Sequence, residues 1–318
     1  MEKKYDVVAL GELLIDFTEN GVSPQGNPVL EANPGGAPCN VLAMLRKLGH
    51  RVAFIGKIGR DIFGAQLKAA LKEVCIDTAG LVETEEYRTT LAFVHTLPGG
   101  NREFSFYRNP GADMMLKKEE LNQELITSSK IFHFGTLSMT HEGCRNATVS
   151  AVELAKKSGA VISFDPNIRE MLWENTEVLR EQILYGLSVC DVLKIADNEI
   201  EWLTGCKNYH DGIDFIRNRY DISLILVSLG AQGSIACSGG CEVFAPAVLR
   251  EDTIETTGAG DTFCGCILHY VLLNGLRVYD EAELKEMLGF ANAAASLVTT
   301  KRGALRVMPT IDEIMANQ

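Results

Sequence analysis

The sequence predicts an α/β fold: a mostly parallel sheet with helices on both faces, and a small second sheet beside it. Short runs of apolar residues alternate with helical patterns along most of the chain. Strands that are apolar throughout are typical of a parallel sheet whose two faces are both covered by helices. One region instead alternates polar and apolar residues, which indicates a separate, half-exposed sheet.

Six apolar runs are the predicted strands of the large sheet, and helical segments lie between them. Residues 41–48 form one such helix, because Val41, Leu45 and Leu48 fall on one face and Gly49 is a natural terminator. Another helical pattern ends at Gly159. The predicted strands are residues 7–10, 52–55, 131–134, 161–164, 192–195 and 224–227.

The small sheet is predicted from two segments. Residues 88–108 read as two alternating strands around residues 98–101, which is the pattern of a β-hairpin, and residues 22–32 add another strand. Insertions at about 18–33 and 88–108 would then form a lid on a single domain of residues 1–318. The simpler interpretation is an extension of the main sheet.

Composition and charge exclude several classes of protein. With 318 residues, 46% of them hydrophobic and 23% charged, the chain is neither disordered nor a small disulfide scaffold. Acidic residues outnumber basic ones by 42 to 30, and the net charge of -12 disfavours nucleic acid and anionic membranes as partners. The sequence has no apolar run of 18 residues, no signal peptide pattern and no CxxC pair among nine cysteines. We therefore expect a cytoplasmic protein.

The strongest chemical signal is a glycine-rich turn that runs into an apolar helix. Residues 255–261, ETTGAGD, precede TFCGCILHYVLLNG, whose lack of charge is typical of a buried helix. Free N–H groups and the helix dipole at such an N-terminus attract anions, and Gly258 and Gly260 let a ligand approach the backbone. Asp261 sits at the same place. The alternative is structural: Asp261 caps the helix and the glycines form a tight turn.

A second glycine pair precedes the helix at 41–48. In NPGGAPCN, residues 33–40, Gly35 and Gly36 would let a ligand touch the backbone, and Asn40 offers a donor and an acceptor to a hydroxyl. The alternative is an ordinary capping loop. The sequence has no P-loop pattern, and no GxGxxG follows the first strand, which argues against a nicotinamide dehydrogenase.

Together, PGGAPCN and TTGAGDTF resemble the two signatures of the ribokinase-like (PfkB) carbohydrate kinases, and the similarity is strongest to fructokinases. GELLIDF, FIGKIG, REFSFYRNPGADMML and FDPNIR match in the same order along the chain. The resemblance implies a Rossmann-like domain with a β-lid and ATP-dependent phosphorylation of a sugar hydroxyl, which in fructokinases is the 6-hydroxyl of fructose. It also implies Mg²⁺ as a cofactor and a homodimer that pairs through the lids.

The resemblance gives particular residues a role. Asp261 matches the catalytic base, and Gly258, Ala259 and Gly260 match the anion hole. Two arginines match residues near the sugar, Arg108 and Arg169, and either could instead be a surface charge. Asp16 is expected at the end of the first strand. Sugar binding is implied for Asp16, Gly35, Gly36, Asn40, Arg108 and Arg169.

Nucleotide and metal contacts follow from the same resemblance. Glu201, in the N-x-x-E motif, matches a residue that acts on magnesium, here through water because this ion keeps several waters. Its alternative role is a surface glutamate. Glu255, Thr257 and Gly303 match a monovalent-cation site, but the family usually has Asp in place of Glu255, which weakens the expectation of potassium. Nucleotide binding is implied for Asn198, Ser228, Gly230, Gly233 and Asn292.

Several functions compete with fructose phosphorylation. A 2-keto-3-deoxygluconate kinase could use Arg108 and Arg169 to bind the substrate carboxylate, whereas Glu12 and Asp16 near the sugar favour a neutral polyol. A nucleoside kinase is a further alternative. A sugar-binding or regulatory protein that kept the fold would have lost the base, and Asp261 is present.

Overall fold

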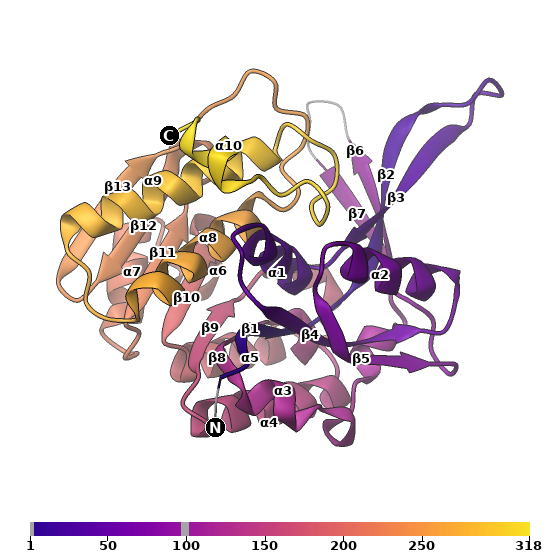
Figure 1. Ribbon diagram of the computed structural model, residues 1–318, viewed down its shortest axis with the longest axis horizontal. Coiled ribbons are helices and arrows are strands. Elements are labelled where there is room, and N and C mark those ends of the chain that lie inside the picture. Colours follow the sequence, from indigo (N-terminus) through magenta and orange to yellow (C-terminus); the bar gives the residue numbers. More distant parts are fainter. Residues whose placement is uncertain (1–2, 97–101) are drawn as a thin grey trace.

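The large sheet runs through the middle of the molecule with helices on both sides (Figure 1). The computed structural model describes residues 3–96 and 102–318, and within them this sheet has nine strands in the order β13-β12-β11-β10-β9-β8-β1-β4-β5. The strands from β5 to β11 are parallel, and β12 and β13 are antiparallel. Their bounds are β1 Tyr5–Leu10, β4 Val52–Gly59, β5 Asp77–Thr84, β8 Ser129–Gly135, β9 Val161–Asp165, β10 Val192–Ala196, β11 Leu224–Ser228, β12 Gly233–Ser238 and β13 Cys241–Pro246.

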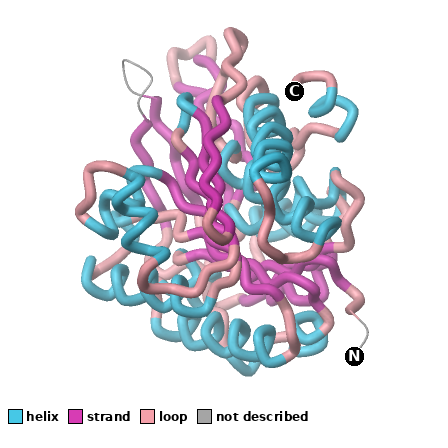
Figure 2. The backbone as a smooth tube through the Cα atoms, turned by 90° about the vertical axis from the view of Figure 1, so that its left-hand side faces the viewer, coloured by secondary structure: helices cyan, strands magenta, loops and turns pink. Residues whose placement is uncertain are grey.

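Ten α-helices in the described ranges cover the two faces of this sheet, as the cyan helices around the magenta strands show in Figure 2. The apolar side chains of one group pack with α1, and those of the other pack with α4. The first group is α1 Ala37–Lys47, α2 Ile62–Glu73, α8 Ala259–Asn274, α9 Glu281–Val298 and α10 Ile311–Met315. The second is α3 Gln123–Thr127, α4 Glu142–Lys157, α5 Thr176–Val189, α6 Asp197–Thr204 and α7 Tyr209–Arg217.

The continuous apolar strands are explained by burial on both faces. Val7 and Ala9 of β1 belong to the core under α1 and α8, whereas Val8 and Leu10 belong to the core over α4 and α5. All six predicted strands are confirmed. The sequence patterns missed β5, β12 and β13, because these strands lie towards the edges of the sheet and mix exposed with buried positions or carry glycine and serine.

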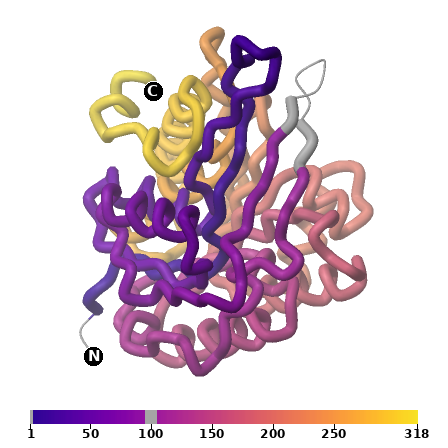
Figure 3. Tube along the Cα trace, turned by 90° about the vertical axis from the view of Figure 1, so that its right-hand side faces the viewer, coloured from indigo at the N-terminus to yellow at the C-terminus, as the bar shows by residue number. Residues whose placement is uncertain are grey.

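Four strands form the small sheet in the order β3-β2-β6-β7. They are β2 Leu14–Val22, β3 Pro28–Gly35, β6 Leu91–Thr96 and β7 Arg102–Tyr107. Two distant segments of the chain therefore lie side by side, the β2–β3 hairpin in indigo and β6 with β7 in purple (Figure 3).

Two expectations for this sheet need correction. Residues 22–32 are not one strand, because a turn that includes the Gly26 N–H bond to the Ser23 carbonyl separates β2 from β3. Asp16 does not end the first strand: β1 ends at Leu10, and Asp16 lies within β2. The predicted hairpin strands within 88–108 are confirmed, while the predicted turn at 98–101 lies outside the described residues.

None of the helices in the described part of the chain has the length and apolar character needed to cross a membrane.

Candidate active site

A cavity of about 390 Å³ lies where the small sheet meets the large one. It is lined by residues that follow the carboxyl ends of β1, β8, β9 and β10, which is where open α/β sheets bind ligands. Both glycine turns reach it, through Gly36 at the start of α1 and Gly258 at the start of α8. The structure thus brings together two motifs that are more than two hundred residues apart in sequence.

Gly258 is the N-cap of α8 and needs to be glycine. Its φ is +78°, and a Cβ there would lie 2.5 Å from the Cβ of Ala304. Ala259 and Gly260 already belong to the helix, and Asp261 is its third residue rather than its cap. The capping interpretation of Asp261 is therefore wrong: its carboxylate lies beside a helix N-terminus, the kind of place at which proteins bind anions.

Asp261 receives a hydrogen bond from across the cavity. The Nδ2 of Asn40, in the first turn of α1, donates to Oδ2 of Asp261 at 2.8 Å. Part of Asp261 faces the cavity, yet its carboxyl is surrounded by protein, and this burial raises the pKa of Asp261 to about 6. The bond from Asn40 and the charges of Lys194 and Arg169 act in the opposite direction and keep the pKa from rising further.

Lys194 is a buried cation beside the glycine turn, and motif matching did not identify it. It lies on β10, its side chain is 9% exposed, and its Nζ is 3.0 Å from Oδ2 of Asp165. A Cβ at Gly260 would approach this Nζ to 3.2 Å. Burial alone would lower the pKa of Lys194, but the surrounding carboxylates, chiefly Asp165 and Glu199, raise it above the usual range. The signal in the sequence was a lysine inside an otherwise apolar strand.

The N-x-x-E motif is oriented differently from the prediction. Asn198 lines the cavity, but Glu201 is exposed and does not. Glu199 is the acidic residue of α6 that reaches the cavity, because it accepts hydrogen bonds from the N–H groups of Ile168 at 2.6 Å and Ala196 at 2.8 Å. Burial raises the pKa of Glu199.

Two acidic residues from the start of the chain complete the cavity wall. Glu12 accepts the Ala37 N–H at 2.8 Å and so fixes the start of α1. Asp16 lies over Gly35, where a Cβ would collide with its carboxylate. Both carboxyls line the cavity, and burial raises the pKa of each to about 7.

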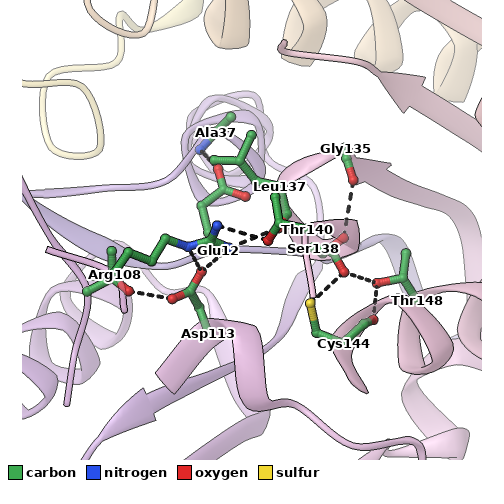
Figure 4. Close-up of polar contacts among 11 residues, drawn as sticks. Glu12, Ala37, Arg108, Asp113, Gly135, Leu137, Ser138, Thr140, Cys144 and Thr148 are labelled. Carbon is green, nitrogen blue, oxygen red and sulfur yellow. Dashed lines mark hydrogen bonds and ion pairs between the residues drawn. The ribbon is translucent and has the colours of Figure 1, made fainter. Parts of the chain in front are cut away.

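Arg108 does not line this cavity. Figure 4 shows it beside Asp113, Leu137 and Thr140 instead. Its Nε donates to Asp113 at 2.8 Å, and its terminal nitrogens donate to the Leu137 carbonyl and to Oγ1 of Thr140, both at 2.9 Å. The side chains of Arg108 and Asp113 are 3% and 2% exposed. Arg108 therefore ties the end of β7 to the body, because a buried guanidinium keeps its charge only with such partners.

Arg169 and Asn167 follow β9 and do line the cavity. One terminal nitrogen of Arg169 donates to the Ile168 carbonyl at 2.9 Å. Asn167 has a φ of +45°, a conformation that is uncommon outside glycine and often marks a functional position. Asn167 was not predicted; a positive φ cannot be recognised from its residue type alone.

Of the expected nucleotide residues, Asn198 lines the cavity, whereas Ser228, Gly230, Gly233 and Asn292 do not. Ser228 ends β11, and Gly230 and Gly233 flank the turn that leads into β12. Asn292 is engaged within the protein: its Oδ1 accepts from Ser234 at 2.8 Å, and its Nδ2 donates to the Ala245 and Pro246 carbonyls. In this structure Asn292 joins α9 to the β12–β13 pair.

Two of the three expected monovalent-cation residues come together, Glu255 and Gly303. Oε1 of Glu255, which is 9% exposed, accepts the Gly303 N–H at 2.9 Å. Thr257 lines the cavity two residues further along the chain. The longer carboxylate therefore reaches the loop that the resemblance pairs with it.

Known proteins share this architecture. The family model for pfkB family carbohydrate kinases matches residues 4–311. Probable fructokinase-3 of Arabidopsis thaliana is 42% identical over 98% of this chain and 90% of its own. Fructokinase from Xylella fastidiosa with bound ATP has a TM-score of 0.88 and 30% identity, with 99% and 98% of the two chains covered. A double-mutant fructokinase from Vibrio cholerae O395 with fructose, ADP and potassium ion has a TM-score of 0.86 and 27% identity, covering 100% and 99%. The chain belongs to the pfkB family of carbohydrate kinases.

Proposed function

We propose that this ATP-dependent sugar kinase phosphorylates the 6-hydroxyl of D-fructose. The observation that carries the proposal is the position of Asp261, in the first turn of α8, within the same cavity as Asp16 and the Gly36 turn. A base for the sugar hydroxyl and an anion site for the phosphoryl group thus adjoin one another. The fructokinase names of relatives that align over nearly the whole chain support fructose as the acceptor.

Asp261 accepts the proton of the attacking hydroxyl in the proposed mechanism. Its pKa of about 6 leaves it ionised near neutral pH but close enough to take a proton. The N–H groups of Gly258 and Gly260 stabilise the charge that develops on the phosphoryl oxygens. The Ala259 N–H already donates to the Thr256 carbonyl at 3.3 Å and would have to leave it to join them. Lys194, next to Gly260, adds a fixed positive charge at the same point.

Magnesium fits the acidic side of the cavity. Its preferred ligands are oxygens, and Asn198 and Glu199 supply them at the cavity wall. Because Glu199 already accepts two backbone N–H groups, we expect it to hold the ion through water. When bound, the ion neutralises phosphate charge. Glu201 is exposed and is no longer our candidate ligand.

The charges of the cavity favour a neutral sugar. Glu12 and Asp16 line it, whereas Arg108 is occupied by Asp113 and two oxygens of the body. Arg169 alone remains of the two arginines that a 2-keto-3-deoxygluconate kinase would use for the substrate carboxylate. An acidic acceptor would therefore find one arginine rather than two for its carboxylate.

The small sheet is proposed to act as a lid that covers the bound sugar and excludes water. Asp16 on β2 and Phe106 on β7 place both of its segments at the cavity. Val22, Val29 and Leu30 are exposed on the β2–β3 hairpin, which fits the expected pairing of lids in a homodimer. The nine cysteines, which the structure leaves unpaired, favour a reducing compartment such as the cytoplasm.

Potassium is proposed as an activator at Glu255, Thr257 and Gly303. A single backbone N–H does not neutralise the buried Glu255 carboxylate, so a cation beside it would be favoured. The potassium ion in the Vibrio cholerae fructokinase supports the same proposal.

A panel of acceptors tests the proposed substrate. ATP consumption is measured with fructose, glucose, ribose, adenosine and 2-keto-3-deoxygluconate, and the fructose product is identified by phosphorus NMR. We expect the highest kcat/KM with fructose and phosphorylation at the 6-hydroxyl. A much higher kcat/KM with the acidic sugar would refute the proposal in favour of the 2-keto-3-deoxygluconate kinase, and turnover of adenosine alone would indicate a nucleoside kinase.

A further inference from the structure

Asn40 joins the two helices whose first turns form the cavity. It is 4% exposed and lies in the first turn of α1, and its Nδ2 is 2.8 Å from Oδ2 of Asp261 in the first turn of α8. An ionised carboxylate only accepts hydrogen bonds, so the amide must present its NH₂ group to Asp261. The same bond would disfavour a proton on Oδ2.

The packing of α1 against α8 holds this pair in place. One turn beyond Asp261, Gly265 faces Met44 and Val41 of α1, and a Cβ at Gly265 would lie 2.8 Å from the Cβ of Met44. Glycine therefore allows close approach of the helices. Glu12 fixes the start of α1 through the Ala37 N–H. The Asn40–Asp261 bond is thus set by backbone positions rather than by a flexible surface contact.

The other atom of the Asn40 amide is also informative. Its Oδ1 is buried and has no hydrogen-bond partner among the residues the structure describes. A buried polar atom without a partner is costly, and such atoms in native proteins call for an explanation. Rotating the amide by half a turn would place Oδ1 of Asn40 against a carboxylate oxygen of Asp261, and neither of these atoms can donate a hydrogen bond. The bond to Asp261 therefore dictates the orientation of the amide.

We propose that Asn40 is a positioning residue for the base: its Nδ2–H holds the Asp261 carboxylate ionised and occupies Oδ2, so that Oδ1 of Asp261 takes the proton of the sugar hydroxyl. This inference rests on the proposed role of Asp261. It gives Asn40 a function that a residue that merely binds sugar would not have, because its loss would act on the base even when no sugar is bound.

The charges around Asp261 determine how strongly Asn40 is needed. Asp16 on β2 and Asp165 on β9 oppose ionisation of Asp261, whereas Lys194 on β10 and Arg169 after β9 favour it. Burial outweighs the two cations, since the pKa of Asp261 is raised to about 6. Without the amide, the carboxyl would lose one of the contacts that favour its charged form, and its pKa would rise further.

The test is a direct titration of Asp261 in the full-length protein. Carbon-13 NMR of labelled aspartate follows the carboxyl signal, which the Asp261→Asn variant identifies by its absence. We expect a midpoint near pH 6 in the native protein and one about one pH unit higher in Asn40→Leu. Asn40→Ser, whose side chain is too short to reach Asp261, should show the same shift. It takes the place of Asn40→Leu if that variant folds poorly. Asn198→Leu removes another amide from the same cavity and should leave the midpoint unchanged.

Kinetics provide a second and independent readout. If Asn40 acts through Asp261, Asn40→Leu should lower kcat in the native background but have little further effect in the Asp261→Asn background. An unchanged Asp261 midpoint in both Asn40 variants, or the same kcat loss in both backgrounds, overturns this inference. Retention of kcat by Asp261→Asn alone would instead contradict the proposed base, so the two failures are distinguishable.

Discussion

Gly36, which lines the cavity, is a position at which a single added methyl group should disturb the structure strongly. Its φ is +125°, and a Cβ there would overlap the Glu12 carbonyl oxygen and lie 3.1 Å from the Glu12 carbonyl carbon. The obstacle is backbone, which cannot swing away as a side chain can. We expect Gly36→Ala to lose about 1–2 kcal/mol from the unfavourable φ and about 1–3 kcal/mol from the forced separation of the two segments.

Gly49 at the other end of α1 offers a matched control. Its φ is +88°, and nothing lies within 4 Å of a Cβ built there. Gly49→Ala therefore carries the cost of φ alone, about 1 kcal/mol. Urea denaturation followed by circular dichroism should give a free energy of unfolding for Gly36→Ala that is lower than for Gly49→Ala by about 2 kcal/mol.

The activity of the same variants adds a functional test. Because Gly36 precedes the helix that carries Asn40, displacement of the turn should reduce kcat/KM for the sugar by on the order of a hundredfold. Gly49→Ala should retain nearly native kinetics. Equal unfolding free energies for the two variants would show that the close approach of Gly36 to Glu12 is not a constraint, and the reasoning would be refuted.

Three further predictions concern charge. Asp16 holds its proton up to about pH 7 in the folded protein but only to about pH 4 when unfolded, so the stability from this difference is full below pH 4 and is lost as the pH rises to 7. About three pKa units correspond to about 4 kcal/mol at most. In urea denaturation at pH 8, the free energy of unfolding of Asp16→Asn should therefore exceed that of the native protein by up to about 4 kcal/mol, and this advantage should be lost near pH 4. Asp113→Asn leaves Arg108 buried without its counter-charge and should lower the free energy of unfolding by about 3–5 kcal/mol. Glu85→Gln, which breaks the exposed pair with Arg60, should change the urea midpoint little. Equal effects of the two substitutions would contradict the burial argument. Activity should be higher in potassium chloride than in choline chloride, and Glu255→Gln, which keeps an acceptor for the Gly303 N–H, should abolish that difference; no difference in the native enzyme would exclude the proposed cation site.

The strands of the large sheet could be predicted from the sequence because a strand that is buried on both faces is a continuous run of apolar residues. The run at 192–195 is one example, and it became β10. The small sheet was harder to predict, because its strands carry exposed residues and β2 ends in a short turn that the pattern at 22–32 does not reveal.

Both glycine motifs singled out in the sequence line the cavity, but side-chain partners could not be predicted in the same way. Glu199 and Glu201 are two residues apart on α6, and only the contact with Ile168 decides which of them reaches the cavity. Arg108 follows β7 of the small sheet, yet its hydrogen bonds to Asp113 and the Leu137 carbonyl hold it in the body of the protein. Such contacts depend on distant segments, so local periodicity carries no information about them.

The steady-state kinetics of Asp261→Asn test the central claim most directly. Asparagine has nearly the same size as aspartate, and Gly258 rather than Asp261 caps α8, so the variant should fold. As a general base, Asp261 should be worth on the order of 10²–10⁴ in rate. We predict that kcat falls by this factor while KM for fructose and for ATP changes only a few-fold, the pattern of an interaction made mainly in the transition state. A native kcat with a raised KM for fructose would contradict the account, because Asp261 would then hold the sugar without accepting its proton.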